Sequence, residues 1–320
     1  MNMAIQLIEN KSELGAGTRG ASLGIDALRI ASLNKGSDYF LKNKVITLKN
    51  NNEMLFNSVK LASAKRIKGI VKVFSRVCDQ VEKTLTEGKF PIILAADHSS
   101  AGGTIAGIKK KYPNKRLGAI WIDAHADLHS PYTSPTGNVH GMPLATAIAF
   151  DNKECQVKEP SKEAIKYWTE LKEMGGTSPK IRTEDIVFFG VRDTESPEDE
   201  LMLREGIKNF TVAETREKGI EKACIEALQI LKNCDIIYIS FDVDSMDCDL
   251  VSTGTGTPVP NGYTPEEANS IIQNLISSEK LICFEMVEIN PTLDNKKNLM
   301  AETAFDILVN TTNTLEKKHS

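Results

Sequence analysis

The chain has 320 residues, of which 41% are hydrophobic and 26% charged, and its formal net charge is −4 at pH 7. That length and hydrophobic share can bury a large core, and the lack of excess Lys or Arg argues against nucleic acid or an anionic membrane as a partner. The first ten residues show no secretion signal, and the apolar runs are too short to span a bilayer, so we expect a cytoplasmic protein.

Short apolar runs alternate along the chain with longer amphipathic stretches. In order, the pattern predicts strands at 4–8 and 45–48, a helix at 61–87, a strand at 91–96, a helix at 101–111, a strand at 117–122, a helix at 162–174, a strand at 186–191, a helix at 214–232, a strand at 236–241, a helix at 265–278, a strand at 281–287 and a helix at 299–315. Thr264 with Glu267 predicts a capping box at the start of one helix. The polar segment 152–180 is expected to be an excursion from the core.

The predicted strands are rich in β-branched residues and apolar on both faces, which is typical of central strands in a parallel sheet. Strand–helix alternation of this kind predicts a single domain over residues 1–320, an α/β fold with three α/β/α layers and a mainly parallel sheet. The six cysteines contain no C-x-x-C pair, so we expect reduced and mostly buried thiols.

Three predicted strands run directly into clusters of Asp and His. These clusters are Asp97–His98, then Asp123, His125 and Asp127, and finally Asp242 and Asp244. Ligands of parallel sheets bind beyond the carboxyl ends of the strands, so the clusters should share one pocket. Carboxylates pooled there could not all ionise without cations between them, which predicts a pair of divalent metals. Carboxylate-rich sites with one imidazole per metal favour Mn²⁺, with Fe²⁺, Co²⁺ or Ni²⁺ as substitutes.

The order of the motifs resembles the ureohydrolase family, to which arginases, agmatinases and formiminoglutamases belong. The motifs are D-H-S (97–99), W-I-D-A-H-A-D (121–127), N-V-H-G-M-P (138–143), S-F-D-V-D-S-M-D (240–247), G-T-G-T-P (254–258) and M-V-E-I-N-P (286–291), and the segment 19–29 is similar to the family's first helix. The resemblance covers nearly the whole chain. It implies a homo-oligomer, either a trimer or a hexamer.

The resemblance also implies the metal ligands. One metal would be bound by His98, Asp123, Asp127 and Asp242, and the other by His125, Asp123, Asp242 and Asp244. Asp123 and Asp242 would bridge the metals, and a hydroxide between them, oriented by Asp127, would be the nucleophile.

Two further residues suit the hydrolysis of a guanidino group. His140 is a candidate for protonating the leaving amine because His titrates near neutral pH, although a structural hydrogen bond would also account for it. Glu288 follows the last predicted strand and would pair with the substrate guanidinium; the alternative is a salt bridge at the strand end. His319 lies in a polar tail and has no assigned role.

Two segments resemble the corresponding segments of arginases within this family. Ser134, Thr136 and Asn138 match the positions that hold the α-carboxylate of arginine, and Asp193, Glu195 and Glu198 match the loop that receives its α-amino group. The acidic run could instead be a solvated loop and helix start. Thr257 of the G-T-G-T-P motif is also expected in the substrate site.

Three positions depart from the family pattern. Ala95–Ala96 replace two glycines, His129 replaces an Asn that binds the substrate carboxylate, and Cys248 replaces a Pro. His129 can still donate a hydrogen bond to a carboxylate, so we expect it to bind substrate.

The expected reaction is therefore the hydrolysis of L-arginine to urea and L-ornithine. Agmatine, another guanidino acid or formiminoglutamate remain alternative substrates, and a metal-binding protein without turnover is an alternative of another class. A two-metal deacetylase or phosphatase would lack the carboxylate of M-V-E-I-N-P and the loop at 134–141.

Overall fold

The computed structural model describes residues 4–318, which form eight strands in one sheet and the helices that cover it. His319 lies outside the described residues. The strands are β1 (Ile5–Asn10), β2 (Val45–Thr47), β3 (Phe90–Ala95), β4 (Leu117–Ile122), β5 (Ile186–Phe189), β6 (Lys208–Phe210), β7 (Ile236–Asp242) and β8 (Leu281–Val287). Every neighbouring pair is parallel, and the strand order is β2-β1-β3-β8-β7-β4-β5-β6.

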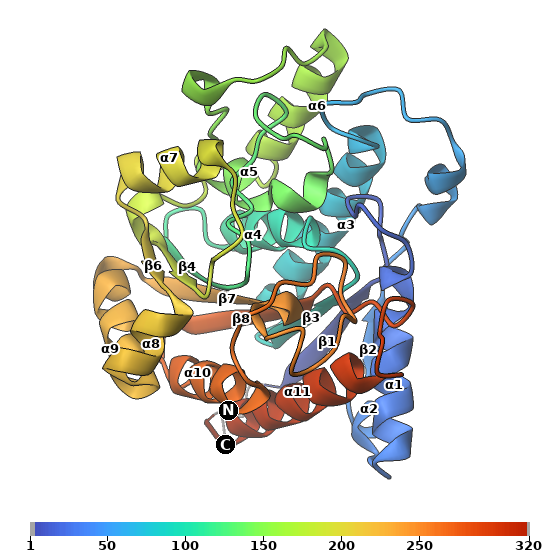
Figure 1. The fold of residues 1–320 in the computed structure, drawn as a ribbon, viewed down its shortest axis with the longest axis vertical. Helices are drawn as coiled ribbons and strands as arrows, with labels where there is room; N and C mark the ends of the chain where they lie inside the picture. The colour runs from blue at the N-terminus through green and yellow to red at the C-terminus, as the bar shows by residue number, and fades with distance from the viewer. Residues whose placement is uncertain (1–3, 319–320) are drawn as a thin grey trace.

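Helices cover both faces of this sheet, which confirms the predicted three-layer arrangement (Figure 1). On one face lie α3 (Ile67–Thr86), α4 (Ser100–Lys111), α5 (Pro143–Ile148) and α6 (Lys162–Glu173). On the other lie α1 (Gly24–Asn34), α9 (Ile220–Ile230), α10 (Pro265–Ile276) and α11 (Leu299–Lys318). The remaining α-helices described are α2 (Tyr39–Lys42), α7 (Ser196–Glu205) and α8 (Val212–Lys218).

Several predicted boundaries change for local physical reasons. The helix expected from residue 61 begins at Ile67, because the preceding Arg66 has a left-handed backbone with φ of 56°. The helix expected at 214–232 is divided into α8 and α9 by Gly219, whose φ of 88° does not fit a right-handed helix. The edge strand β6 was not predicted, because it is only three residues long and starts with the polar pair Lys208–Asn209.

Other local expectations are confirmed. Thr264 caps α10 in a reciprocal capping box with Glu267. All six cysteines are free, and five of them are buried. The polar segment around α6 does not leave the core, however, because Trp168 and Leu171 are fully buried against the α3 side of the sheet.

The sheet order places the motif-bearing strands side by side. Strands β3, β8, β7 and β4 are consecutive in the centre of the sheet; β3, β7 and β4 each lead into one of the three Asp and His clusters, and β8 leads into Glu288. Because all strands are parallel, these clusters meet at one edge of the sheet. None of the helices within residues 4–318 combines the length and hydropathy that crossing a bilayer requires.

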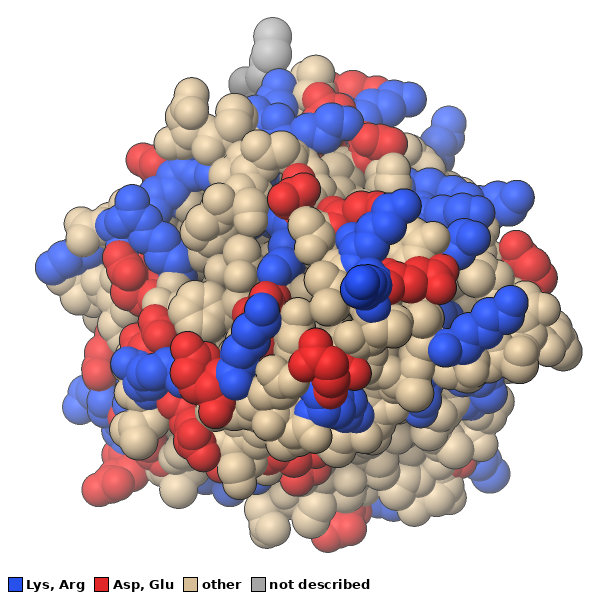
Figure 2. All heavy atoms as spheres, turned by 90° about the horizontal axis from the view of Figure 1, so that it is seen from above, with Lys and Arg blue, Asp and Glu red and all other residues tan. Residues whose placement is uncertain are grey.

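The outer surface gives no sign of a highly charged docking face on the side seen in Figure 2. Lys and Arg side chains alternate there with Asp and Glu, and no large patch carries a single sign. A nucleic-acid site normally needs a continuous basic stripe, and this face does not provide one.

Candidate metal centre and substrate pocket

The first group of metal-type ligands forms around His98, which follows β3. Its Nδ1 lies 3.0 Å from Asp123 Oδ2, 3.0 Å from Asp127 Oδ2 and 3.1 Å from Asp242 Oδ2. These four side chains come from the ends of three central strands, β3, β7 and β4, and all are buried. The structure thus brings together the four residues expected for one metal.

The second group forms around His125, which lies two residues beyond Asp123. Its Nδ1 is 3.1 Å from Asp244 Oδ2 and 3.5 Å from Asp123 Oδ1. Asp123 therefore turns one oxygen to each group, as a bridging carboxylate would. Asp242 Oδ1 accepts the backbone N–H of Asp244 at 2.8 Å, which fixes the carboxylate between the two groups.

The chemistry of these atoms fits a pair of divalent cations. His98 Nδ1, Asp123 Oδ2 and Asp127 Oδ2 are buried and have no hydrogen-bond partner, and such atoms are costly to leave unpaired. Burial, Asp244 and Asp123 together raise the pKa of Asp242 well above its usual range. Burial and Asp123 raise the pKa of Asp244 to about 6 despite the opposing effect of His125. Cations placed among these side chains would give the buried atoms a partner and would offset the repulsion between the carboxylates.

Residues around the first ligand group hold its imidazole in place. His98 Nε2 lies 2.7 Å from Ser240 Oγ, and the His98 ring stacks on Trp121 with the centroids 4.1 Å apart. In a metal-bound state, Nε2–H would donate to Ser240 and leave Nδ1 as the nitrogen that binds the cation. Ser240 was not predicted as a site residue. Its position on β7, two residues before Asp242, places both side chains on the same face of the strand and could have indicated its role.

Tyr238 and Glu285 continue this polar group away from the centre. Tyr238 lies two residues before Ser240 on β7, and its hydroxyl donates to Glu285 Oε2 at 2.6 Å. Glu285 is completely buried and lies opposite Ser240 in the register between β7 and β8. Glu285 lies within the apolar strand β8, and a Glu in such a strand could have been predicted from the sequence as part of a buried polar group.

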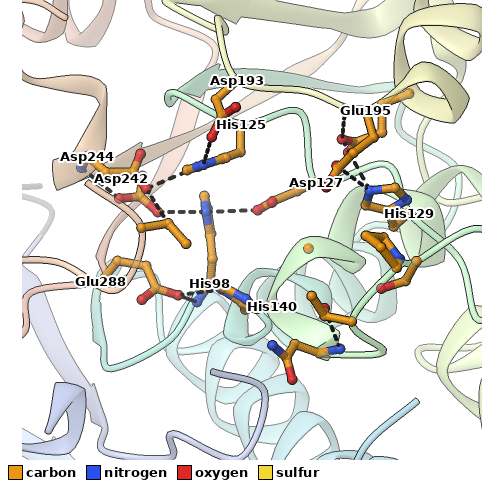
Figure 3. A pocket seen from close by; sticks show the side chains of 17 residues that line it. His98, His125, Asp127, His129, His140, Asp193, Glu195, Asp242, Asp244 and Glu288 are labelled. Atoms are coloured by element: carbon orange, nitrogen blue, oxygen red, sulfur yellow. Dashed lines mark hydrogen bonds and ion pairs between the residues drawn. The ribbon is translucent and has the colours of Figure 1, made fainter. Parts of the chain in front are cut away.

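Glu288 and His140 lie together beside the first ligand group (Figure 3). His140 Nδ1 is 3.3 Å from Glu288 Oε1, and the same oxygen accepts the backbone N–H of His98 at 2.9 Å. Burial alone would lower the pKa of His140, but Glu288 and Asp127 outweigh it and raise that pKa. Glu288 Oε2 is buried without a partner, so it is available to a cationic ligand.

Two of these strand-end residues have unusual backbone conformations. Asp127 and Glu288 have φ values of 53° and 68°, in the left-handed region that favours glycine. Such conformations cost free energy and are found preferentially where a side chain must be aimed at a functional centre.

Above the metal-type ligands lies a cavity of about 170 Å³. It is lined by all the residues expected to bind substrate, which are His129, Ser134, Thr136, Asn138, Asp193, Glu195, Glu198 and Thr257. We call Ser134, Thr136 and Asn138 the hydroxyl–amide group and Asp193, Glu195 and Glu198 the acidic group.

In the hydroxyl–amide group, the two hydroxyl oxygens already accept backbone hydrogen bonds. Ser134 Oγ accepts from Gly137 N–H at 2.9 Å, and Thr136 Oγ1 accepts from Asn138 N–H at 3.1 Å. Each hydroxyl proton is therefore free to be donated to a ligand.

The acidic group is held by α7 and the loop before it. Glu195 and Glu198 form a reciprocal capping box at the start of α7, so this run is an ordered helix start rather than a solvated loop. Glu198 Oε1 also accepts the backbone N–H of Leu128 at 3.0 Å. Burial raises the pKa of Glu198 to about 7, although His129 opposes the shift.

The two remaining expected residues take other positions. His129 belongs to the acidic side: its Nε2 is 2.7 Å from Glu195 Oε2 and its Nδ1 is 3.1 Å from Thr133 Oγ1, so both ring nitrogens have partners. Thr257 Oγ1 donates to Asp244 Oδ2 at 3.1 Å, which places it against a metal-type ligand.

Comparison with known proteins agrees with this geometry. The model of the Arginase family matches residues 5–312. The chain is 32% identical to the arginase of Bacillus subtilis (strain 168) over 311 residues, covering 96% of this chain and 97% of the relative. It is also 32% identical to the arginase of Brevibacillus brevis, with 96% and 97% covered.

A solved structure gives the same result at the level of the fold. The native arginase of Bacillus caldovelox superimposes with a TM-score of 0.79 at 30% sequence identity, covering 97% of this chain and 98% of that one. The chain belongs to the arginase family and is a metal-dependent hydrolase that acts on a guanidino group.

Proposed function

We propose that this protein hydrolyses L-arginine to L-ornithine and urea with two divalent metal ions, Mn²⁺ in the first place, with Fe²⁺, Co²⁺ or Ni²⁺ as substitutes. The observation that carries the proposal is the composition of the cavity. A metal-type centre and Glu288 lie at its base, and a hydroxyl–amide group and an acidic group lie above them. A substrate that suits it has a guanidinium at one end and an α-amino acid at the other. The relatives named arginase support the same substrate.

The metal ions would be held by His98, Asp123, Asp127 and Asp242 on one side and by His125, Asp123, Asp242 and Asp244 on the other. When bound, such ions acidify water and so make a nucleophile available at neutral pH. Asp127 orients the attacking water through its carboxylate, which its left-handed backbone turns toward the cavity.

Glu288 binds and orients the guanidinium. Its unpartnered Oε2 provides an acceptor and a negative charge in a buried position, and the backbone N–H of His98 holds its other oxygen. A planar guanidinium pairs well with such a carboxylate, which positions its central carbon over the metal-type ligands. His140 faces the same carboxylate and gives a proton to the leaving amine from its ring nitrogen.

The upper part of the cavity favours arginine over agmatine. Ser134 and Thr136 offer hydroxyl protons to an α-carboxylate, and the acidic group opposite offers acceptors to an α-ammonium. Agmatine keeps an ammonium at this end but lacks the α-carboxylate, so it would leave the hydroxyl protons of Ser134 and Thr136 without an acceptor. Each polar group left unpaired beneath a bound substrate costs roughly 1–3 kcal/mol, so two such groups would separate the substrates by a factor of about 10² or more.

We propose a single catalytic domain spanning residues 1–320, a cytoplasmic location and assembly into a homo-oligomer, a trimer or a hexamer, with a small guanidino compound as the partner molecule.

The deciding experiment is a substrate panel on Mn²⁺-loaded protein. Urea release from L-arginine and agmatine, and formamide release from formiminoglutamate, would be measured as kcat/KM. Arginine should exceed the others by at least about a hundredfold. A tenfold preference for agmatine or formiminoglutamate would overturn the arginase assignment and leave the metal-dependent hydrolase standing.

A further inference from the structure

Lys65 contacts the hydroxyl–amide group from outside the cavity, in the segment that leads into α3. Its Nζ donates to Asn138 Oδ1 at 3.1 Å, and its backbone N–H donates to the carbonyl of Gly137 at 2.7 Å. The two segments approach so closely because residue 137 is a glycine: a Cβ there would lie 1.9 Å from the carbonyl oxygen of Ala62. Lys65 is thus joined to the recognition loop by its main chain and, separately, by its side chain.

The side-chain contact determines which way the Asn138 amide faces. An ammonium group can only donate hydrogen bonds, so the amide atom beside Lys65 must be the oxygen. The Nδ2 group, with its two protons, is then turned away from Lys65, and Asn138 lines the cavity. Together with the free hydroxyl protons of Ser134 and Thr136, this makes the whole group a set of donors. A set of donors without acceptors suits a carboxylate.

The distribution of charge around the cavity also indicates a role for Lys65 in binding a carboxylate. Four carboxylates that line the cavity, Asp193, Glu195, Glu198 and Glu288, are not among the proposed metal ligands, and no Lys or Arg is among its lining residues. Within residues 4–318, Lys65 forms no ion pair with a carboxylate that would neutralise it, and its ammonium lies one amide group away from the cavity. It is therefore a cation placed to offset the repulsion that a substrate carboxylate meets on entering.

We propose that Lys65 is a positioning residue for the α-carboxylate of the substrate: it fixes the Asn138 amide with its donors toward the cavity and supplies positive charge behind it. The inference rests on the proposed function, because only a substrate with a carboxylate at this end benefits. Lys65 contributes to the affinity for amino-acid substrates and not to the chemical step, which takes place at the opposite end of the cavity.

The test compares Lys65→Met and Lys65→Arg with the matched control Lys68→Met, which changes an exposed lysine on the first turn of α3. All variants keep the main-chain bond from residue 65 to Gly137, so the loop stays attached. With the Mn²⁺-loaded enzyme, Lys65→Met should raise KM for L-arginine about tenfold with kcat nearly unchanged, since a charge-assisted contact is lost. KM for agmatine should stay the same. Lys65→Arg should restore most of the arginine affinity, and Lys68→Met should behave as the parent protein.

A second measurement does not depend on turnover. Calorimetric binding of L-ornithine, which has the α-carboxylate, should weaken about tenfold in Lys65→Met, whereas binding of putrescine, which lacks it, should not change. An unchanged ornithine affinity, or equal losses for ornithine and putrescine, would overturn the role of Lys65. A parent enzyme that prefers agmatine would contradict the proposed function, and the ornithine and putrescine titrations would still decide on Lys65.

Discussion

The Nε2 atom of His129 lies 2.7 Å from Oε2 of Glu195, so the histidine at this position is paired with the acidic group rather than with the hydroxyl–amide group. Its other ring nitrogen faces Thr133 Oγ1 at 3.1 Å. From the sequence alone we expect His129 to donate to the substrate carboxylate in place of an Asn. In the structure its donors are engaged, and its contact with substrate would run through Glu195.

We therefore expect His129→Asn and Glu195→Gln to act as one unit on arginine affinity. Each change should raise KM severalfold, and the double variant should cost little more than either single one, because both break the same pair. The measurement is a double-mutant cycle on kcat/KM, with Asp199→Asn on the outer side of α7 as a control. Additive losses would show that the two side chains act separately.

The same pair should make stability depend on pH. Burial lowers the pKa of His129, but Glu195 and Glu198 raise it above the usual 6.5 overall. A raised folded-state pKa stabilises the fold below the unfolded value and loses that effect as pH rises through the folded value. The difference in Tm between the parent and His129→Asn should thus be present below about pH 6.5 and should shrink above the folded pKa. A constant difference from pH 5 to 9 would reject this linkage.

The metal centre should control both activity and stability. Elemental analysis of the loaded protein should approach two Mn²⁺ per chain, and chelation should abolish turnover and lower Tm, since the buried carboxylates then repel one another. Asp242→Ala should be at least as damaging as Asp244→Ala, because Asp242 would be shared by both metals. Full activity in chelated protein would contradict the two-metal assignment.

Replacing His140 tests its role as proton donor. His140→Ala should lower kcat by roughly 10²–10⁴-fold, the usual scale of general acid–base catalysis, with metal content unchanged. Glu288→Gln is the informative companion, because it should mainly raise KM by removing the charge that faces the guanidinium. A near-normal kcat in His140→Ala would leave only the structural contact with Glu288.

Ser240 should affect metal affinity without touching the metal. Ser240→Ala removes the acceptor of His98 Nε2, and partners of this kind are worth about 10–100-fold in metal affinity. Competition with a fluorescent chelator would measure the change. Ser245→Ala is a matched control, because Ser245 is a buried serine beside Asp244 whose hydroxyl donates to the carbonyl of Asp242. Equal losses in the two variants would indicate a general loss of packing.

The sequence by itself determined seven of the eight strands described, the layers and the metal-type residues, because each depends on local order. Apolar runs such as 236–241 are buried on both faces, and a parallel strand of that kind needs only its own composition to be recognised. The residues after the strands, such as Asp242 and Asp244, then converge for any parallel sheet, since all carboxyl ends meet at one edge. The prediction of one helix at 214–232 was wrong for a local reason as well: Gly219 divides the helix, although the apolar pattern continues through it.

Only the tertiary structure decided which side chains face one another across the cavity. Residues 65 and 138, or 129 and 195, are separated by many residues in the chain, and their contacts depend on how two loops lie on the sheet. Neither a periodic pattern nor a motif encodes the rotamer that pairs His129 with Glu195 or the amide orientation of Asn138. Hydrogen bonds are short-ranged and directional, so these assignments require the positions of the atoms themselves.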